Sequence, residues 1–277
     1  GGSYDLVSKR IREIENMPMN WRDEDIAMAL YFEVDVGREF MDEVYGEERI
    51  SMAHIKYDGL DGYGWSFSKD TVLNVGIGCP RNIIKKLKSE KKGWSERKYL
   101  LDYVETLKEQ GWFPKDIEID RKMISGANIP VGMGMSCTVG DRMMVVGDAG
   151  GFVSPLSGEG LYYALDSGRL AAESLDVLFS EGDFKKQDLM HYHRAWSSKW
   201  GDDLEWLKVG WHLLMVMPNS LIKYAALDEE TKEFFTHMFV GSMPAAKIKN
   251  KVLALIAKGV LKHEVLSLMT GNKQTVP

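Results

Sequence analysis

One stretch of the sequence constrains the fold more than any other: residues 142–175, RMMVVGDAGGFVSPLSGEGLYYALDSGRLAAESL. It reads as a short apolar strand over 142–146, a glycine-rich loop, and a helix that opens at Gly158-Glu159-Gly160. The first N–H groups of a helix lack partners within it, and the helix dipole places partial positive charge there. The segment therefore predicts a site for an anion, or for an oxygen that gains negative charge. Asp148 is placed to accept hydrogen bonds from hydroxyls.

Strand patterns precede this segment and helix patterns follow it. β-branched and aromatic content predicts a strand over 27–37. Apolar and aromatic residues at period two predict strands over 49–57 and 117–123, and a hairpin over 62–78. Ser95 can cap a helix that runs to about Gln110, and after about Lys185 we find only helical spacing, including an amphipathic tail helix over 247–266. Strands first and helices afterwards predict an α+β fold with a helical C-terminal part.

Composition excludes several classes of protein. The chain has 277 residues, of which 44% are hydrophobic, and its formal net charge of −6 argues against a nucleic-acid binder. Two cysteines cannot make a disulfide framework, and the six histidines do not form a metal-ligand set, so no metal is expected. No apolar run reaches the roughly 18 residues that span a bilayer, and no secretory signal is found. A cytoplasmic location, with or without peripheral contact to a membrane, is expected.

The wording of residues 147–173 resembles the last FAD-binding motif of flavoprotein oxidoreductases related to aromatic hydroxylases. It is most similar to the geranylgeranyl reductase family, which includes the digeranylgeranylglycerophospholipid reductases that saturate archaeal membrane lipids. The resemblance implies FAD as cofactor, with Asp148 at its ribityl chain or pyrophosphate and the helix start against the N1–C2=O edge of the flavin. The cofactor-binding residues implied are Gly147, Asp148, Pro155, Gly158, Glu159 and Gly160.

A second motif supports this resemblance. Geranylgeranyl reductases resemble one another in a YxWxFP stretch that is followed seven or eight residues later by GxG. The present sequence has YGWSFS from residue 63 and GIG from residue 76, with Ser68 where the family has proline. The substrate-binding residues that the resemblance implies are Tyr63, Trp65, Phe67, Gly76 and Gly78. The alternative is that the three aromatic side chains form only the core face of a sheet.

The sequence lacks the strand–GxGxxG–helix segment with which a flavoprotein of this type should begin. The chain therefore looks like the C-terminal two-thirds of a flavoenzyme, able to hold the isoalloxazine side of FAD but to bind the whole cofactor weakly. The predicted organisation is a polar lead-in over 1–26 and a β-rich substrate-binding domain over 27–140. The C-terminal part of the FAD-binding domain follows over 141–180, and a helical region over 181–277.

The function that the resemblance implies is reduction of C=C bonds in isoprenoid (geranylgeranyl) chains of membrane ether-lipid precursors, with hydride from reduced FAD. Ferredoxin or NAD(P)H would supply the electrons, and the sequence identifies no catalytic proton donor. Two alternatives stay open: an FAD-dependent hydroxylase or monooxygenase of the same fold, and a non-catalytic lipid-binding fragment without the nucleotide domain.

Four other features have a structural and a functional interpretation. The basic run over 81–92 is either a solvated face or a docking surface for an acidic electron donor or a lipid phosphate. The tail helix packs on the body or lies on an anionic membrane. Cys79 is a buried small residue or a thiol near the flavin. The stripe of tryptophans packs helices or lines a lipid tunnel: Trp196, Trp200 and Trp211.

Overall fold

The computed structural model describes residues 2–132, 134–181 and 183–219, together with 221–222, 229, 232–233 and 236–237. The chain forms two compact units. One, the sheet unit, is Arg22–Ile129, and the other, the helical unit, is Gly1–Trp21 with Pro130–Pro277. The four-part organisation expected from the sequence stays a prediction.

A five-stranded sheet forms the centre of the sheet unit, in the order β2-β3-β4-β1-β5. Its strands are β1 Ile26–Asp35, β2 Met52–Ile55, β3 Tyr63–Ser68, β4 Val72–Pro80 and β5 Ser125–Pro130. The β3–β4 pair is antiparallel, with Trp65 opposite Gly76, and β4 pairs antiparallel with β1. The predicted hairpin and the predicted strand over 27–37 are therefore confirmed.

One face of this sheet forms the hydrophobic core with helix α4, Glu96–Glu109. Because side chains alternate along a strand, Leu73, Val75 and Ile77 of β4 lie on the same face and are all buried in that core. The side chain of Ser95 accepts a hydrogen bond from the N–H of Lys98 at 3.2 Å, which confirms the predicted helix cap. Two shorter helices complete the unit, α2 Arg38–Tyr45 and α3 Arg81–Glu90.

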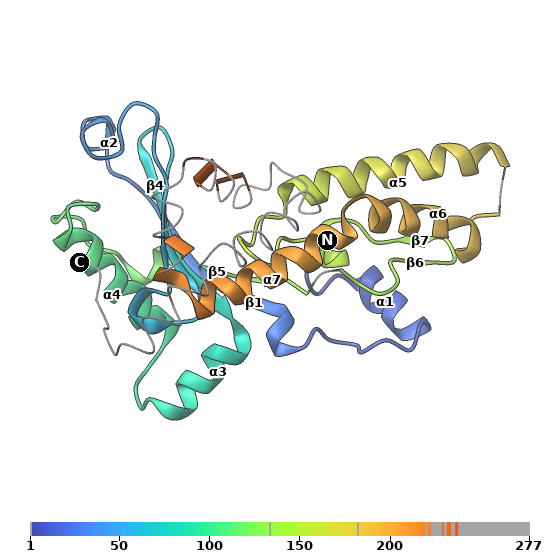
Figure 1. Ribbon diagram of the computed structural model, residues 1–277, viewed down its shortest axis with the longest axis horizontal. Coiled ribbons are helices and arrows are strands. Elements are labelled where there is room, and N and C mark those ends of the chain that lie inside the picture. Colours follow the sequence, from blue (N-terminus) through green and yellow to red (C-terminus); the bar gives the residue numbers. More distant parts are fainter. Residues whose placement is uncertain are drawn as a thin grey trace. The chain divides into compact units, whose positions relative to one another are not determined.

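The helical unit carries the glycine-rich segment. Its helices are α1 Leu6–Ile14, α5 Leu161–Glu181, α6 Lys186–Trp196 and α7 Asp202–Val216. A π-helical turn, Ser197–Gly201, joins α6 to α7, and α5 and α6 lie side by side (Figure 1). Two short strands, β6 Val139–Gly140 and β7 Met143–Met144, precede a 3-10 turn over Gly147–Gly150 and then the loop that leads to α5. Helices and an antiparallel sheet together confirm the α+β prediction.

Three strand predictions differ from the structure. The strand over 117–123 is wrong, because Arg121–Met123 form a 3-10 turn and β5 begins only at Ser125. Ile117 and Ile119 pack against the core without a partner strand, so their alternation reflects burial rather than pairing. The strands expected over 49–57 and 142–146 are shortened to β2 and β7. The predicted tail helix lies outside the described residues.

None of the helices among the described residues combines the length and the apolar character that crossing a bilayer requires.

Candidate functional site

Hydrogen bonds hold the glycine-rich loop, residues 147–160, against the start of α5. The N–H of Gly147 donates to Ser167 Oγ at 3.0 Å, and that hydroxyl donates to the carbonyl of Ala164. Gly147 has a φ of 59°, and an added Cβ there would lie 3.3 Å from the Cβ of Ala164. Further along, the N–H of Ser154 donates to the carbonyl of Glu159 at 2.8 Å. Glycine is therefore needed at the first position of the loop, since a side chain would add strain and crowd the helix.

Aromatic side chains pack around the middle of the same loop. The ring of Phe152, which is fully buried, has its centroid 4.8 Å from the rings of both Trp196 and Trp200. On another side, an added Cβ on Gly151 would lie 2.5 Å from Cη2 of Trp21, so that indole contacts the loop backbone. Trp196 and Trp200 thus pack within the protein, and they fix the conformation of the loop.

Two carboxylates flank the start of α5. An added Cβ on Gly160 would lie 3.1 Å from Oδ1 of Asp148, so this carboxylate lies against the first residues of the helix. Burial raises the pKa of Asp148. Oε1 of Glu159 accepts a hydrogen bond from the N–H of Tyr162 at 2.9 Å, whereas Oε2 is buried and has no hydrogen-bond partner among the described residues. The helix start therefore presents a buried, unpaired acceptor next to a second carboxylate.

The chemistry of these groups fits a flavin at its sugar and ring edge. Ionised carboxylates only accept hydrogen bonds, so Asp148 and Glu159 suit hydroxyls or a ring N–H rather than phosphate oxygens. Backbone N–H groups at a helix start suit a ring carbonyl that gains negative charge. A polyhydroxyl chain attached to a ring with N–H and C=O groups combines these requirements, as in the ribityl chain and pyrimidine edge of FAD.

The structure brings together most of the cofactor-binding residues expected from the sequence. Gly147 and Asp148 lie in the 3-10 turn at the start of the loop, and Glu159 and Gly160 lie at the helix start. Gly158 precedes them with a φ of 73°, and Pro155 is buried inside the loop. Their roles toward FAD stay predictions.

In the sheet unit, the indole of Trp65 lies along strand β4. An added Cβ on Gly76 would lie 2.2 Å from its Cζ2, and one on Gly78 would lie 3.4 Å from its Cζ3. At the other end of the ring system, Nε1 donates to Oδ1 of Asn74 at 2.7 Å. The indole therefore extends over three alternate residues of β4, and the two glycines leave the space that it occupies. The spacing of the aromatic and GxG motifs follows from this contact across the hairpin.

Tyr63 and Phe67 lie on either side of Trp65 along β3, and we call these three residues the aromatic ladder. The ring centroids of Tyr63 and Phe67 are 5.7 and 5.8 Å from that of Trp65. Trp65 is 8% exposed and Phe67 is 37% exposed. Burial raises the pKa of Tyr63 to about 12, so its phenol is neutral at pH 7. The ladder lies on the face opposite Val75 and Ile77 and is not part of the core formed with α4.

Ser68, which departs from the family's proline, has a local role at the end of β3. Its hydroxyl donates a shared hydrogen bond to the carbonyls of Arg49 and Ile50, at 2.6 and 2.9 Å. The strand end is thus tied to the segment before β2 by a side chain that proline lacks.

Two contributing residues were not found by sequence reasoning. The contact of Asn74 with Trp65 could have been predicted from the sequence, because Asn74 lies two residues before Gly76 and so shares the face of β4 under the indole. The contact of Trp21 with Gly151 could not have been predicted in this way, since it joins segments that are far apart in the chain.

Two further features were sought at the site, a reactive cysteine and a cluster of metal ligands. Burial, together with the charges of Glu96 and Asp61, raises the pKa of Cys79 to about 12. Its thiol therefore stays protonated and unreactive at neutral pH. Within the part of the chain that the structure describes, no three His, Cys, Asp or Glu side chains lie close enough together to hold a metal ion.

Comparison with known proteins gives the chain's relatives. It is 33% identical over 141 residues to a digeranylgeranylglycerophospholipid reductase of Methanocaldococcus jannaschii, a match covering 50% of this chain and 32% of the relative. It is 38% identical over 147 residues to a protein of the same name from Methanoculleus marisnigri (52% and 33%), and 31% identical over 145 residues to a menaquinone reductase of Mycobacterium tuberculosis (50% and 33%). The match thus spans about a third of the length of these relatives. No family model matches the chain.

A solved structure supports the fold. The geranylgeranyl bacteriochlorophyll reductase-like protein of Thermoplasma acidophilum superposes with a TM-score of 0.58 at 21% identity, covering 71% of this chain and 45% of that protein. Together with the sequence relatives, it confirms the resemblance drawn from the two motifs. Over the region that it shares with them, the chain is similar to proteins of the geranylgeranyl reductase family.

Proposed function

We propose that this chain forms the substrate side and the flavin-ring side of an FAD-dependent oxidoreductase that saturates C=C bonds in isoprenoid chains, including those of membrane lipid precursors. The observation that carries the proposal is the aromatic ladder, whose central indole lies on the glycine pair of β4. Relatives with partial matches are named as reductases of a digeranylgeranylglycerophospholipid and of menaquinone.

The helix start and the loop hold the cofactor in this proposal. Asp148 accepts hydrogen bonds from ribityl hydroxyls, and Oε2 of Glu159 accepts one from a donor on the ring or the chain. The N–H groups of the first turn of α5, apart from that of Tyr162, would stabilise negative charge on a ring oxygen. When bound, reduced FAD supplies a hydride to one carbon of the alkene, while a proton reaches the other carbon.

The aromatic ladder binds the isoprenoid chain and stabilises charge. An unactivated alkene accepts hydride poorly, so partial protonation would run ahead and place partial positive charge on carbon. The π faces of Tyr63 and Trp65 favour such a charge by about 1 kcal/mol or more. The phenol of Tyr63 is neutral at pH 7, because burial raises its pKa to about 12. Apolar rings also exclude water from the alkene.

The test uses the full-length gene product. Its absorption spectrum should show bound flavin, and anaerobic incubation with a reductant and a geranylgeranyl lipid should give a product that has gained one H2 per reduced double bond, measured by mass spectrometry. Trp65→Ala should lower the rate at least tenfold, and Trp65→Phe should keep part of it. Trp112→Ala is the matched control, because Trp112 packs at the edge of the core of the same unit.

Three results would contradict the proposal. A folded Trp65→Ala variant with normal rate and products removes the role of the ladder. A product that requires and incorporates molecular oxygen identifies a hydroxylase instead. A full-length protein that binds no flavin leaves only a lipid-binding function.

A further inference from the structure

Positive charge gathers on one part of the sheet unit. Between residues 81 and 98 the sequence has eight Lys and Arg residues and two Glu residues, a net charge of +6 in a chain whose formal net charge is −6. These residues lie on α3, on the turn that follows it, and on the first turn of α4. The charge of this stretch is therefore opposite in sign to that of the chain as a whole.

Ion pairs account for three of the eight cations. Arg81 and Lys85 both bind the carboxylate of Asp23, and Lys88 binds Glu96 with an N–O distance of 2.6 Å. These contacts join α3 to neighbouring parts of its own unit and have a structural role.

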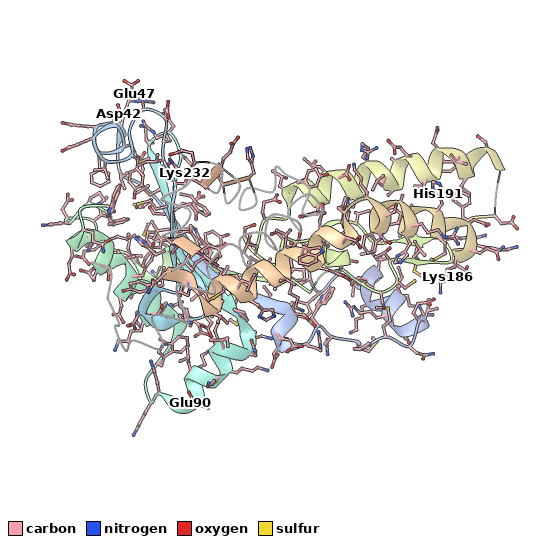
Figure 2. The ribbon with its side chains drawn as sticks, viewed as in Figure 1. Asp42, Glu47, Glu90, Lys186, His191 and Lys232 are labelled. Atoms are coloured by element: carbon pink, nitrogen blue, oxygen red, sulfur yellow. The ribbon has the colours of Figure 1, made fainter. Side chains whose placement is uncertain are left out.

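The other five cations make no ion pair with any described residue, and all five are exposed. We call them the cationic patch: Lys86, Lys91, Lys92, Arg97 and Lys98. Glu90 is the single acidic residue in the stretch that is not in an ion pair with a described residue, so the patch keeps most of its charge. Figure 2 shows Glu90 at the outer end of α3, with its side chain directed away from the protein.

Two of the five cations do not stabilise the helix in which they lie. Arg97 and Lys98 lie in the first turn of α4, where the helix dipole already places partial positive charge. Cations at this end of a helix are unfavourable, so these two residues reduce the stability of α4. The turn between the helices is also open, because an added Cβ on Gly93 would have no atom within 4 Å. Together with the exposure of its five side chains, this leaves the patch open on its own unit.

We propose that the cationic patch binds an anionic membrane surface through lipid phosphates. Four of its five members are lysines, whose compact charges suit a diffuse anionic surface. Interfaces with proteins are instead enriched in Arg and depleted in Lys. Trp94, half-buried in the same turn, is a residue type that favours the lipid headgroup region. This proposal does not rest on flavin chemistry, so it can fail or hold independently of the proposed reaction.

The test is co-sedimentation of the full-length protein with vesicles. The protein should bind vesicles that contain phosphatidylglycerol in phosphatidylcholine, and it should not bind pure phosphatidylcholine. Raising the salt concentration should release it, since surface charges are screened. The variant Lys86→Gln/Lys91→Gln/Lys92→Gln should lower the partition coefficient on anionic vesicles at least tenfold, because each cation near such a surface adds several-fold to binding.

The matched control is Lys9→Gln/Lys115→Gln/Lys122→Gln. It removes the same amount of charge from exposed lysines outside the patch that make no ion pair with a described residue, and it should bind like the unmodified protein. Equal loss of binding in both variants would overturn the proposal, because net charge alone would then explain it. Equal binding to neutral vesicles would also overturn it. Binding to immobilised polyglutamate without binding to anionic vesicles would identify an acidic protein as the partner instead.

Discussion

Replacement of Gly76 by alanine tests the contact that links the two halves of the aromatic motif. The added Cβ would lie 2.2 and 2.5 Å from two atoms of the Trp65 ring, and 2.7 Å from the carbonyl oxygen of Leu30. Carbon atoms in favourable contact are about 3.5–4.0 Å apart, so the ring must move by about 1 Å or more. Overpacking of this kind costs about 1–3 kcal/mol, and loss of the Trp65–Asn74 hydrogen bond adds about 1 kcal/mol. Alanine in a strand regains about 0.5–1 kcal/mol relative to glycine.

We therefore expect Gly76→Ala to lower the free energy of unfolding by about 1–3.5 kcal/mol, measured by urea unfolding with far-UV circular dichroism. Gly78→Ala is the control, because its Cβ would lie 3.4 Å from Trp65 and 3.8 Å from the carbonyl of Met28, which is ordinary contact. It should be neutral or slightly stabilising. In the Trp65→Ala background, Gly76→Ala should cost less than in the unmodified protein, since only the contact with Leu30 remains. Equal effects of the two glycine substitutions would refute the position of the indole.

Three further predictions concern other parts of the chain. Asp166→Ala should destabilise the helical unit by about 3 kcal/mol and change the fluorescence of Trp200, because the buried carboxylate of Asp166 accepts a hydrogen bond from the indole N–H of Trp200 at 2.9 Å. An unfolding midpoint equal to that of the unmodified protein would contradict this prediction. Burial lowers the pKa of His54 and, together with nearby cations, that of His193, so the folded state holds fewer protons than the unfolded state. The free energy of unfolding should therefore fall as the pH drops below about 6.5. Denaturant unfolding at several pH values should show a smaller fall for the variant His54→Gln/His193→Gln. Ser68→Ala should cost about 1 kcal/mol through loss of its hydroxyl contacts, whereas no change in the urea midpoint would show that they contribute nothing.

The parts of the fold that depend on residues close together in the chain could be predicted from the sequence. Period-two aromatics and a polar turn predicted the β3–β4 hairpin, and Ser95 predicted the start of α4, because both signals depend on neighbouring residues alone. The strand expected over 117–123 shows the limit of this reasoning. Its alternating isoleucines are half-buried against the core, but a strand also needs a partner backbone, and a pattern of side chains does not identify one.

The candidate site divides in the same way. The glycines at the helix start, and Gly76 and Gly78 under Trp65, could be recognised in the sequence, since only glycine allows such close contacts. The packing of Trp21 on Gly151 depends on contacts between distant segments and leaves no local signal. The buried Oε2 of Glu159 likewise depends on how the loop folds back on α5.

The most direct measurement is a single turnover of the full-length protein under anaerobic conditions. The protein is loaded with reduced flavin, mixed with a geranylgeranyl lipid, and followed by both flavin absorbance and lipid mass. We expect flavin oxidation to occur together with the gain of one H2 by the lipid, and Trp65→Ala to slow both signals equally. Flavin that stays reduced in the presence of the lipid, with the lipid unchanged, would contradict the proposed function.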